Sequence, residues 1–114
     1  MDLTFTRGDT KSIAIDLVDK QGKRIILTDG DQLYMTVKKN SRDEDFLFQK
    51  KIGNGIEKNE EGKYVITIFA EDTNNLDYGT YGYDIELKSD NVVKTLGIYE
   101  ITLTEEFTHA RNEG

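Results

Sequence analysis

The chain of 114 residues contains no cysteine, no proline, no tryptophan and only one histidine. Without cysteine it can form no disulfide, no thiolate metal site and no cysteine nucleophile. Without proline, the edges of any sheet must be protected by charged side chains or β-bulges. No apolar run exceeds three residues, so the sequence predicts neither a membrane span nor a signal peptide.

Basic residues are also scarce relative to acidic ones. The chain has 15 Lys and Arg against 22 Asp and Glu, which gives a formal net charge of −7. Nucleic acids and anionic membranes bind clusters of Lys and Arg. The short basic groups at Lys38–Arg42 and Lys50-Lys51 are diluted by the acidic run Asp43–Asp45. We therefore expect no nucleic-acid partner and no membrane partner.

Alternation of apolar and polar residues is the dominant pattern, and it is typical of half-buried β-strands. The clearest runs are Ile13–Leu17, Leu33–Val37, Phe46–Ile52, Tyr64–Phe69, Tyr81–Lys88 and Val93–Leu103. The shorter runs Leu3–Thr6 and Arg24–Leu27 bring the set to about eight strands. Gly97 is expected to bend or bulge the last strand. A helical pattern is confined to Ala70–Leu76.

Turn residues separate these runs at the positions that antiparallel hairpins require, for example Asp29-Gly30 and Asp90-Asn91. Strands spaced by about 8–15 residues without long helices favour a sandwich over a parallel α/β sheet. The predicted fold class is all-β, an immunoglobulin-like antiparallel β-sandwich of about seven to nine strands. The sandwich domain is expected over residues 1–104, followed by a polar C-terminal tail over 105–114.

A structural corner is predicted around Leu76, Gly79, Tyr81 and Tyr83. In immunoglobulin-like sandwiches, a tyrosine at the start of one strand turns its hydroxyl back to a backbone group just upstream. Tyr81 stands at that place, and Tyr83 stands where an antibody domain carries its second cysteine, facing Ile15. The alternative is that Tyr81 simply packs as a half-buried strand residue.

The residues predict no enzyme, no cofactor and no small-molecule substrate. The single histidine, His109, lies in the polar tail, where the geometry needed for catalysis is rarely held. Carboxylates at Asp29 and Asp31 and in Asp43–Asp45 could bind calcium, but solvated turns are the favoured explanation and no metal is expected. Arg7-Gly8-Asp9 matches an integrin-recognition tripeptide, although a bend between two strands is the simpler interpretation.

The chain as a whole resembles structural proteins of phages and prophages of Gram-positive bacteria. The residues that carry the resemblance are Phe5–Thr10, Leu27–Asp31, Met35–Lys39, Glu71–Leu76, Gly79–Leu87 and Ile101–Thr104. The pattern is most similar to the N-terminal immunoglobulin-like domain of baseplate upper proteins and to related tail or head domains. The resemblance implies a virion component, assembled in the host cytoplasm, that contacts itself or other phage structural proteins. The chain departs from the baseplate pattern by ending near Gly114.

The sequence leaves two candidate functions. The first is a non-enzymatic phage or prophage assembly module, with the long last strand, including Tyr99, and the tail residue Phe107 as candidate assembly contacts. Phe107 either docks into a neighbouring protein or folds back onto its own domain. The alternative is a bacterial surface immunoglobulin-like module that binds glycan or protein, for which Tyr34, Tyr78 and Tyr99 are the candidate aromatic residues.

Overall fold

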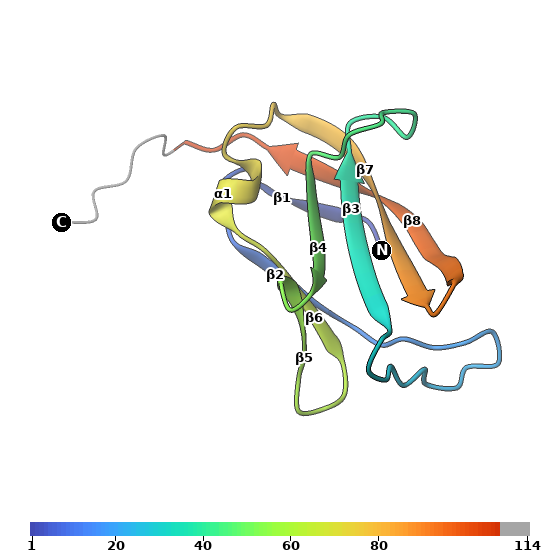
Figure 1. Cartoon of the computed structure of the whole chain (residues 1–114). Coiled ribbons are helices and arrows are strands. Elements are labelled where there is room, and N and C mark those ends of the chain that lie inside the picture. Colours follow the sequence, from blue (N-terminus) through green and yellow to red (C-terminus); the bar gives the residue numbers. More distant parts are fainter. Residues whose placement is uncertain (108–114) are drawn as a thin grey trace.

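A computed structural model describes residues 1–107 of the chain, and these form one eight-stranded sheet with a short helix (Figure 1). The order of strands across the sheet is β1-β8-β7-β3-β4-β5-β6-β2. The elements are β1 (Leu3–Thr6), β2 (Lys11–Ile15), β3 (Gln32–Lys38), β4 (Phe48–Ile52), β5 (Gly55–Lys58), β6 (Tyr64–Ile68), α1 (Ala70–Thr73), β7 (Gly79–Ser89) and β8 (Val92–Thr104).

The sheet curls until it is nearly a barrel. Its two outermost strands, β1 and β2, are consecutive in the chain and are joined by a short turn. Most neighbouring strands are antiparallel, but β1 runs parallel to β8 and β4 runs parallel to β5. The all-β class and the expected number of strands are therefore confirmed. The prediction of a wholly antiparallel sheet is wrong. The last strand, β8, lies beside the first strand, β1, and runs in the same direction.

Two strand assignments from the sequence are also wrong. Arg24–Leu27 forms no strand and makes only one isolated bridge, between Val18 and Arg24. Its residues Ile25 and Leu27 still pack against the core, which explains the apolar alternation without a ladder. The second error is an omission, because the strand β5 lies in a segment where the alternation predicts no strand. There the chain passes from β4 to β5 through Gly53 and Asn54.

The core lies on the inner face of the curled sheet. On β3 and β7 the buried residues alternate with outward-facing ones, and the pairs Met35–Ile85 and Val37–Tyr83 stand directly opposite each other. Burial of such side chains removes apolar surface from water and is the main stabilising term. The helix α1 has four residues, and no helix among residues 1–107 is long and apolar enough to cross a membrane.

The β7–β8 hairpin is the longest feature of the fold. Its turn contains Asp90 at a φ of 53°, in agreement with the predicted Asp90-Asn91 turn. The expected irregularity near Gly97 is also present, because the register shifts between Ile85 and Glu86 and leaves Leu96 as an extra residue on β8.

Candidate protein-interaction surface

The predicted corner is closed by a hydrogen bond from Tyr81. Its hydroxyl donates to the carbonyl oxygen of Asp77 at 2.7 Å, and the side chain is only 4% exposed. Burial is the main cause that raises the pKa of Tyr81 above its usual value. Gly79 begins β7 at a φ of 129°, which residues with a Cβ rarely adopt. Tyr81 and Gly79 therefore hold the chain as it enters β7.

Tyr83 lies two residues further along the inner face of β7. Its ring packs against Tyr99 of β8, directly opposite, with ring centroids 5.4 Å apart. Its hydroxyl donates a hydrogen bond to the carbonyl oxygen of Met1. Burial is again the main cause that raises the pKa of Tyr83, to about 12. These contacts tie the N-terminus to the inner face of the hairpin. Ile15, the predicted partner of Tyr83, lines a hollow together with Tyr99.

Arg7 anchors the end of the chain beyond β8. Its guanidinium makes an ion pair with Glu106 at 3.0 Å and donates to the carbonyl oxygen of Leu76 at 3.0 Å. The same group lies 4.2 Å from the centre of the Tyr78 ring, and the Arg7 side chain is 19% exposed. The arginine of the integrin-type tripeptide is thus engaged within its own domain.

Phe107 follows this anchor directly and is 94% exposed. The preceding residue Glu106 is held with 12% of its side chain exposed, so the order of the domain continues past the expected boundary at Thr104. A large apolar side chain at such an exposed position is available for contact with another molecule. The other candidate in the tail, His109, lies outside the described residues.

The edge of β8 that faces away from β7 is largely unpaired. The strand β7 pairs along β8 from Val92 to Leu103, whereas β1 covers only Ile101–Thr104. The carboxylate of Asp2 accepts the N–H of Glu100 at 2.9 Å. Within residues 1–107, no strand covers this edge between Val92 and Tyr99. Unpaired edges of this kind are templates for pairing with another strand.

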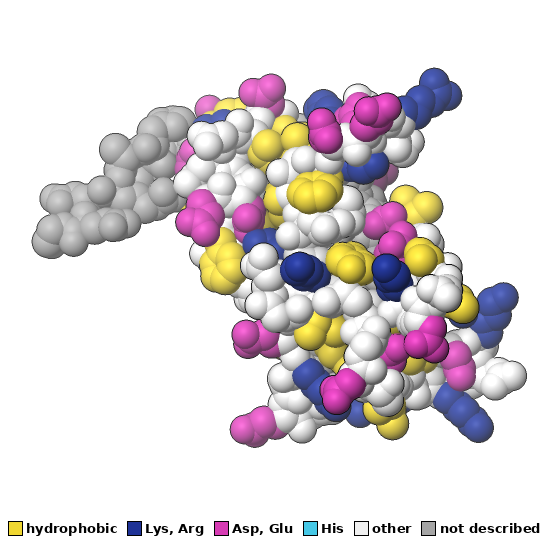
Figure 2. Space-filling view, viewed as in Figure 1, with side chains coloured by type: hydrophobic (Ala, Val, Ile, Leu, Met, Phe, Trp, Pro, Cys, Tyr) yellow, Lys and Arg dark blue, Asp and Glu magenta, His cyan; other side chains and the backbone are white. Residues whose placement is uncertain are grey.

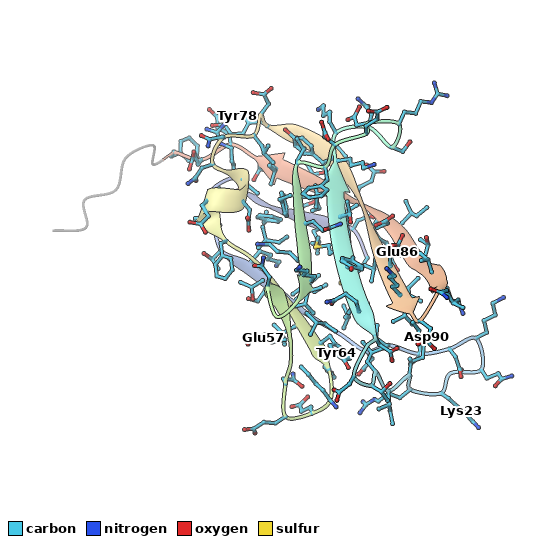
Figure 3. All side chains as sticks on the ribbon, viewed as in Figure 1. Lys23, Glu57, Tyr64, Tyr78, Glu86 and Asp90 are labelled. Atoms are coloured by element: carbon cyan, nitrogen blue, oxygen red, sulfur yellow. The ribbon has the colours of Figure 1, made fainter. Side chains whose placement is uncertain are left out.

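A hollow of about 390 Å³ lies beside this edge, on the inner face of the hairpin. Its lining residues come from the N-terminus, from the segment after β2 and from the hairpin: Met1, Ala14, Ile15, Asp16, Leu17, Val18, Ile85, Leu96 and Tyr99. Figure 3 places Tyr78 and Asp90 at opposite ends of the molecule, so the Arg7 anchor and the hairpin turn are far apart.

The sequence analysis missed a buried ion pair. Lys50 of β4 and Asp72 of α1 are 2.6 Å apart, and their side chains are 7% and 15% exposed. The same carboxylate accepts the N–H of Phe69 at 2.7 Å, which closes the first turn of α1. The ring of Phe69 lies 4.9 Å from the ammonium group. The only signal in the sequence was that Lys50 shares a face with the apolar residues Phe48 and Ile52.

The acidic turns are organised by their own hydrogen bonds. Asp31 accepts the backbone N–H of Thr28 at 2.9 Å and the hydroxyl of Ser89 at 2.7 Å. The hydrogen bond from the Thr28 backbone is the main cause that lowers the pKa of Asp31. Asp43 likewise accepts the N–H of Asn40 at 3.0 Å. Among residues 1–107, no group of three or more acidic or histidine side chains is arranged to hold a metal ion.

The three tyrosines proposed for glycan binding do not form one platform. Tyr34 alternates with the buried Leu33 and Met35 and therefore lies on the outer face of the sheet. Tyr99 packs on the inner face against Tyr83, and Tyr78 lies at the corner beside Arg7. A sugar could contact at most one of these rings in this arrangement.

The outer surface carries both signs of charge. Figure 2 shows hydrophobic side chains in small separate groups among Lys and Arg and Asp and Glu, without a continuous basic area on this face. The most exposed large apolar residues on strands are Ile98 at 79% and Val92 at 66%, both on β8. The exposed apolar residues of the sheet are therefore concentrated on the strand with the free edge.

No protein-family model matches this chain, and no curated protein matches it.

Proposed function

We propose that this chain is a non-enzymatic structural or assembly module of a phage or prophage virion, with an immunoglobulin-like fold. It belongs to the baseplate, tail or head and acts through protein–protein contacts. The resemblance of its strand and turn residues to phage structural domains suggests the virion setting. The observation that carries the contact role is the free edge of β8 beside exposed Val92 and Ile98.

Phe107 supports the same role from the opposite end of the molecule. Its side chain is 94% exposed, immediately after a residue that Arg7 anchors. A domain with two separated contact surfaces can join two neighbours, which is what a repeated assembly requires. The bacterial surface module is the weaker alternative, because the aromatic residues that would bind glycan lie apart.

The experiment is a particle-incorporation assay with particles produced by the strain that encodes the chain. Epitope-tagged protein is followed by immunoblot through purification of the particles, in parallel with the cell-envelope fraction. The proposal predicts that the protein purifies with the particles. Recovery in the envelope fraction, with none in the particles, would overturn the proposal in favour of the surface module.

The contact role of Phe107 is tested with Phe107→Ser, which leaves the Arg7–Glu106 ion pair in place. The matched control is Ile26→Ser, since Ile26 is 72% exposed on the connection between β2 and β3. We expect both variants to melt as the parent does, and only Phe107→Ser to lose incorporation. Equal incorporation of the two variants would remove Phe107 from the assembly contacts.

A further inference from the structure

We infer that two copies of this chain pair through the free edge of β8, antiparallel about a twofold axis, with Val93 of one copy opposite Ile98 of the other. This inference deepens the proposed assembly role by naming one partner, and it rests on that role for its biological setting. The pairing itself is a property of the isolated protein.

The first observation is the composition of the free edge. Edge strands in soluble proteins are usually protected by several charged side chains. Charged residues make up 32% of this chain, yet Val93–Ile98 contains only one, Lys94. Val93 is 55% exposed and Ile98 is 79% exposed. The bulge at Leu96 and the single lysine are the only protective features on this part of the edge.

The second observation is that Val93 and Ile98 lie on the same face. Val93 stands opposite Lys88, and Ile98 stands opposite Asp84. Both partners on β7 alternate with the buried Tyr83 and Ile85 and therefore face outward. Without the bulge, residues five apart would point to opposite faces. The bulge thus places two exposed apolar side chains on one face of one edge.

The third observation is that this register is self-complementary. With Val93 opposite the partner's Ile98, Lys94 falls opposite Gly97. The bulged residues Thr95 and Leu96 of both copies lie at the axis, where they form no regular cross-strand pair. Two Val–Ile pairs form, one on each side of the axis, and no like charges stand opposite each other. Apolar cross-strand pairs stabilise a sheet, whereas like charges directly opposite destabilise it. An isologous contact repeats every favourable pair twice.

The hollow beside the edge gives a further reason for pairing. Leu96 and Tyr99 of β8 line it together with Met1 and Val18. Because Leu96 and Tyr99 belong to the strand with the free edge, a partner strand paired to this edge lies beside the hollow and removes part of its apolar lining from water. One partner strand would therefore both hydrogen-bond the free edge and bury apolar lining of the hollow.

The size of the contact sets its expected strength. A pairing limited to one edge strand falls in the class of small interfaces, below roughly 1,200 Å², which form weak and transient complexes. We therefore expect a concentration-dependent equilibrium between monomer and dimer in solution. The dimer becomes dominant where copies are held close together, because tethering raises the effective concentration.

The test uses the absence of native cysteine. The double variant Val93→Cys/Ile98→Cys places a thiol opposite a thiol at both ends of the paired segment. Within one chain these positions are five residues apart on an extended strand, at least about 15 Å, which is too far for a disulfide. Ile26→Cys, at a comparably exposed position, is the control for random collision. The proteins are oxidised at several concentrations and followed on non-reducing gels and by peptide mapping.

We expect the double variant to form a covalent dimer at least tenfold faster than the control, with peptides joined between positions 93 and 98. Cross-linking no faster than Ile26→Cys, or mapping that joins 93 to 93 and 98 to 98, would overturn the register. A second measurement uses sedimentation equilibrium without cross-linking. Ile98→Glu should abolish dimer that the parent forms, and an unchanged dimer fraction would overturn the use of this edge.

Particle incorporation separates this inference from the proposed function. If Ile98→Glu is monomeric and is incorporated normally, the β8 pairing is refuted as an assembly contact while the virion role stands. If the protein dimerises as described but never purifies with particles, the pairing stands and the virion role is refuted.

Discussion

Replacing Asp72 should destabilise the fold more than replacing Lys50, although the two residues form a single ion pair. The ammonium and carboxylate groups are 2.6 Å apart, and their side chains are 7% and 15% exposed. Asp72 also accepts the N–H of Phe69 at the start of α1. Asp72→Ala leaves the more deeply buried ammonium group without its counter-charge and also removes the helix contact. Lys50→Met leaves the less buried Asp72 carboxylate, which keeps its hydrogen bond from the N–H of Phe69.

The magnitudes follow from these contacts. Removing one partner of a buried ion pair costs about 3–5 kcal/mol, and losing the hydrogen bond at the helix start adds about 1 kcal/mol. We therefore expect Asp72→Ala to lower the free energy of unfolding by about 4–6 kcal/mol. Lys50→Met should lower it by about 3 kcal/mol, the lower end of the range for a broken buried pair, because the Asp72 carboxylate that remains keeps the N–H of Phe69. For a chain of this length, 1 kcal/mol corresponds to roughly 4 °C in Tm.

The assay is urea denaturation followed by circular dichroism, with thermal melts in parallel. The double variant Lys50→Met/Asp72→Ala should be more stable than Asp72→Ala alone, because it no longer contains the unpaired ammonium group. Equal losses for the two single variants would refute the reasoning. A double variant no more stable than Asp72→Ala would show that the lost helix contact, and not the buried charge, causes the destabilisation.

Three further predictions concern the corner, the alkaline pH dependence and metal removal. Tyr81→Phe leaves the carbonyl of Asp77 without its 2.7 Å partner and should cost about 1–3 kcal/mol; urea denaturation measures it, and a Tyr34→Phe control should be nearly neutral. The pKa of Tyr83 is raised to about 12, chiefly by burial, so the folded state keeps its proton to higher pH than the unfolded chain. The contribution of Tyr83 to the free energy of unfolding is therefore complete below about pH 10 and is lost as the pH rises toward 12. The urea midpoint should fall over this range, less steeply in Tyr83→Phe, and equal slopes would contradict the assignment. EDTA should leave the Tm unchanged, because Asp31 is already bonded to Thr28 and Ser89; a fall of several degrees would reveal a bound cation.

Local patterns predicted most strands because alternation reports which residues face inward, whatever their partner is. The runs around Leu33–Val37 and Tyr81–Lys88 correspond to β3 and β7, and their buried residues are those of the alternating apolar set. Alternation does not predict strands where a residue is buried without strand pairing, or paired without burial. Ile25 and Leu27 pack on the core without a ladder, and β5 has only one fully buried residue, Ile56, so it carries little alternation.

The candidate surface was predicted in part. The hydrogen bond of Tyr81 could be expected from local sequence, because a corner tyrosine is a local feature. The sequence left open whether Phe107 folds back onto its own domain, and the structure shows its side chain exposed. Arg7 and Glu106 are 99 positions apart, and no local pattern indicates that they pair. The immunoglobulin-like assignment stays a prediction, and the aromatic residues proposed for glycan binding do not come together.

The sequence by itself determined the all-β class, the approximate number of strands, the turn at Asp90-Asn91 and the irregularity near Gly97. Each of these depends on the side-chain alternation or backbone preference of a few adjacent residues. Only the tertiary structure decided that β1 returns parallel to β8 and stops at its last four residues, Ile101–Thr104. It also decided that Lys50 is buried against Asp72. These features depend on which distant segments meet, and the free energy of that choice is shared over the whole core, so no short stretch of the chain contains it.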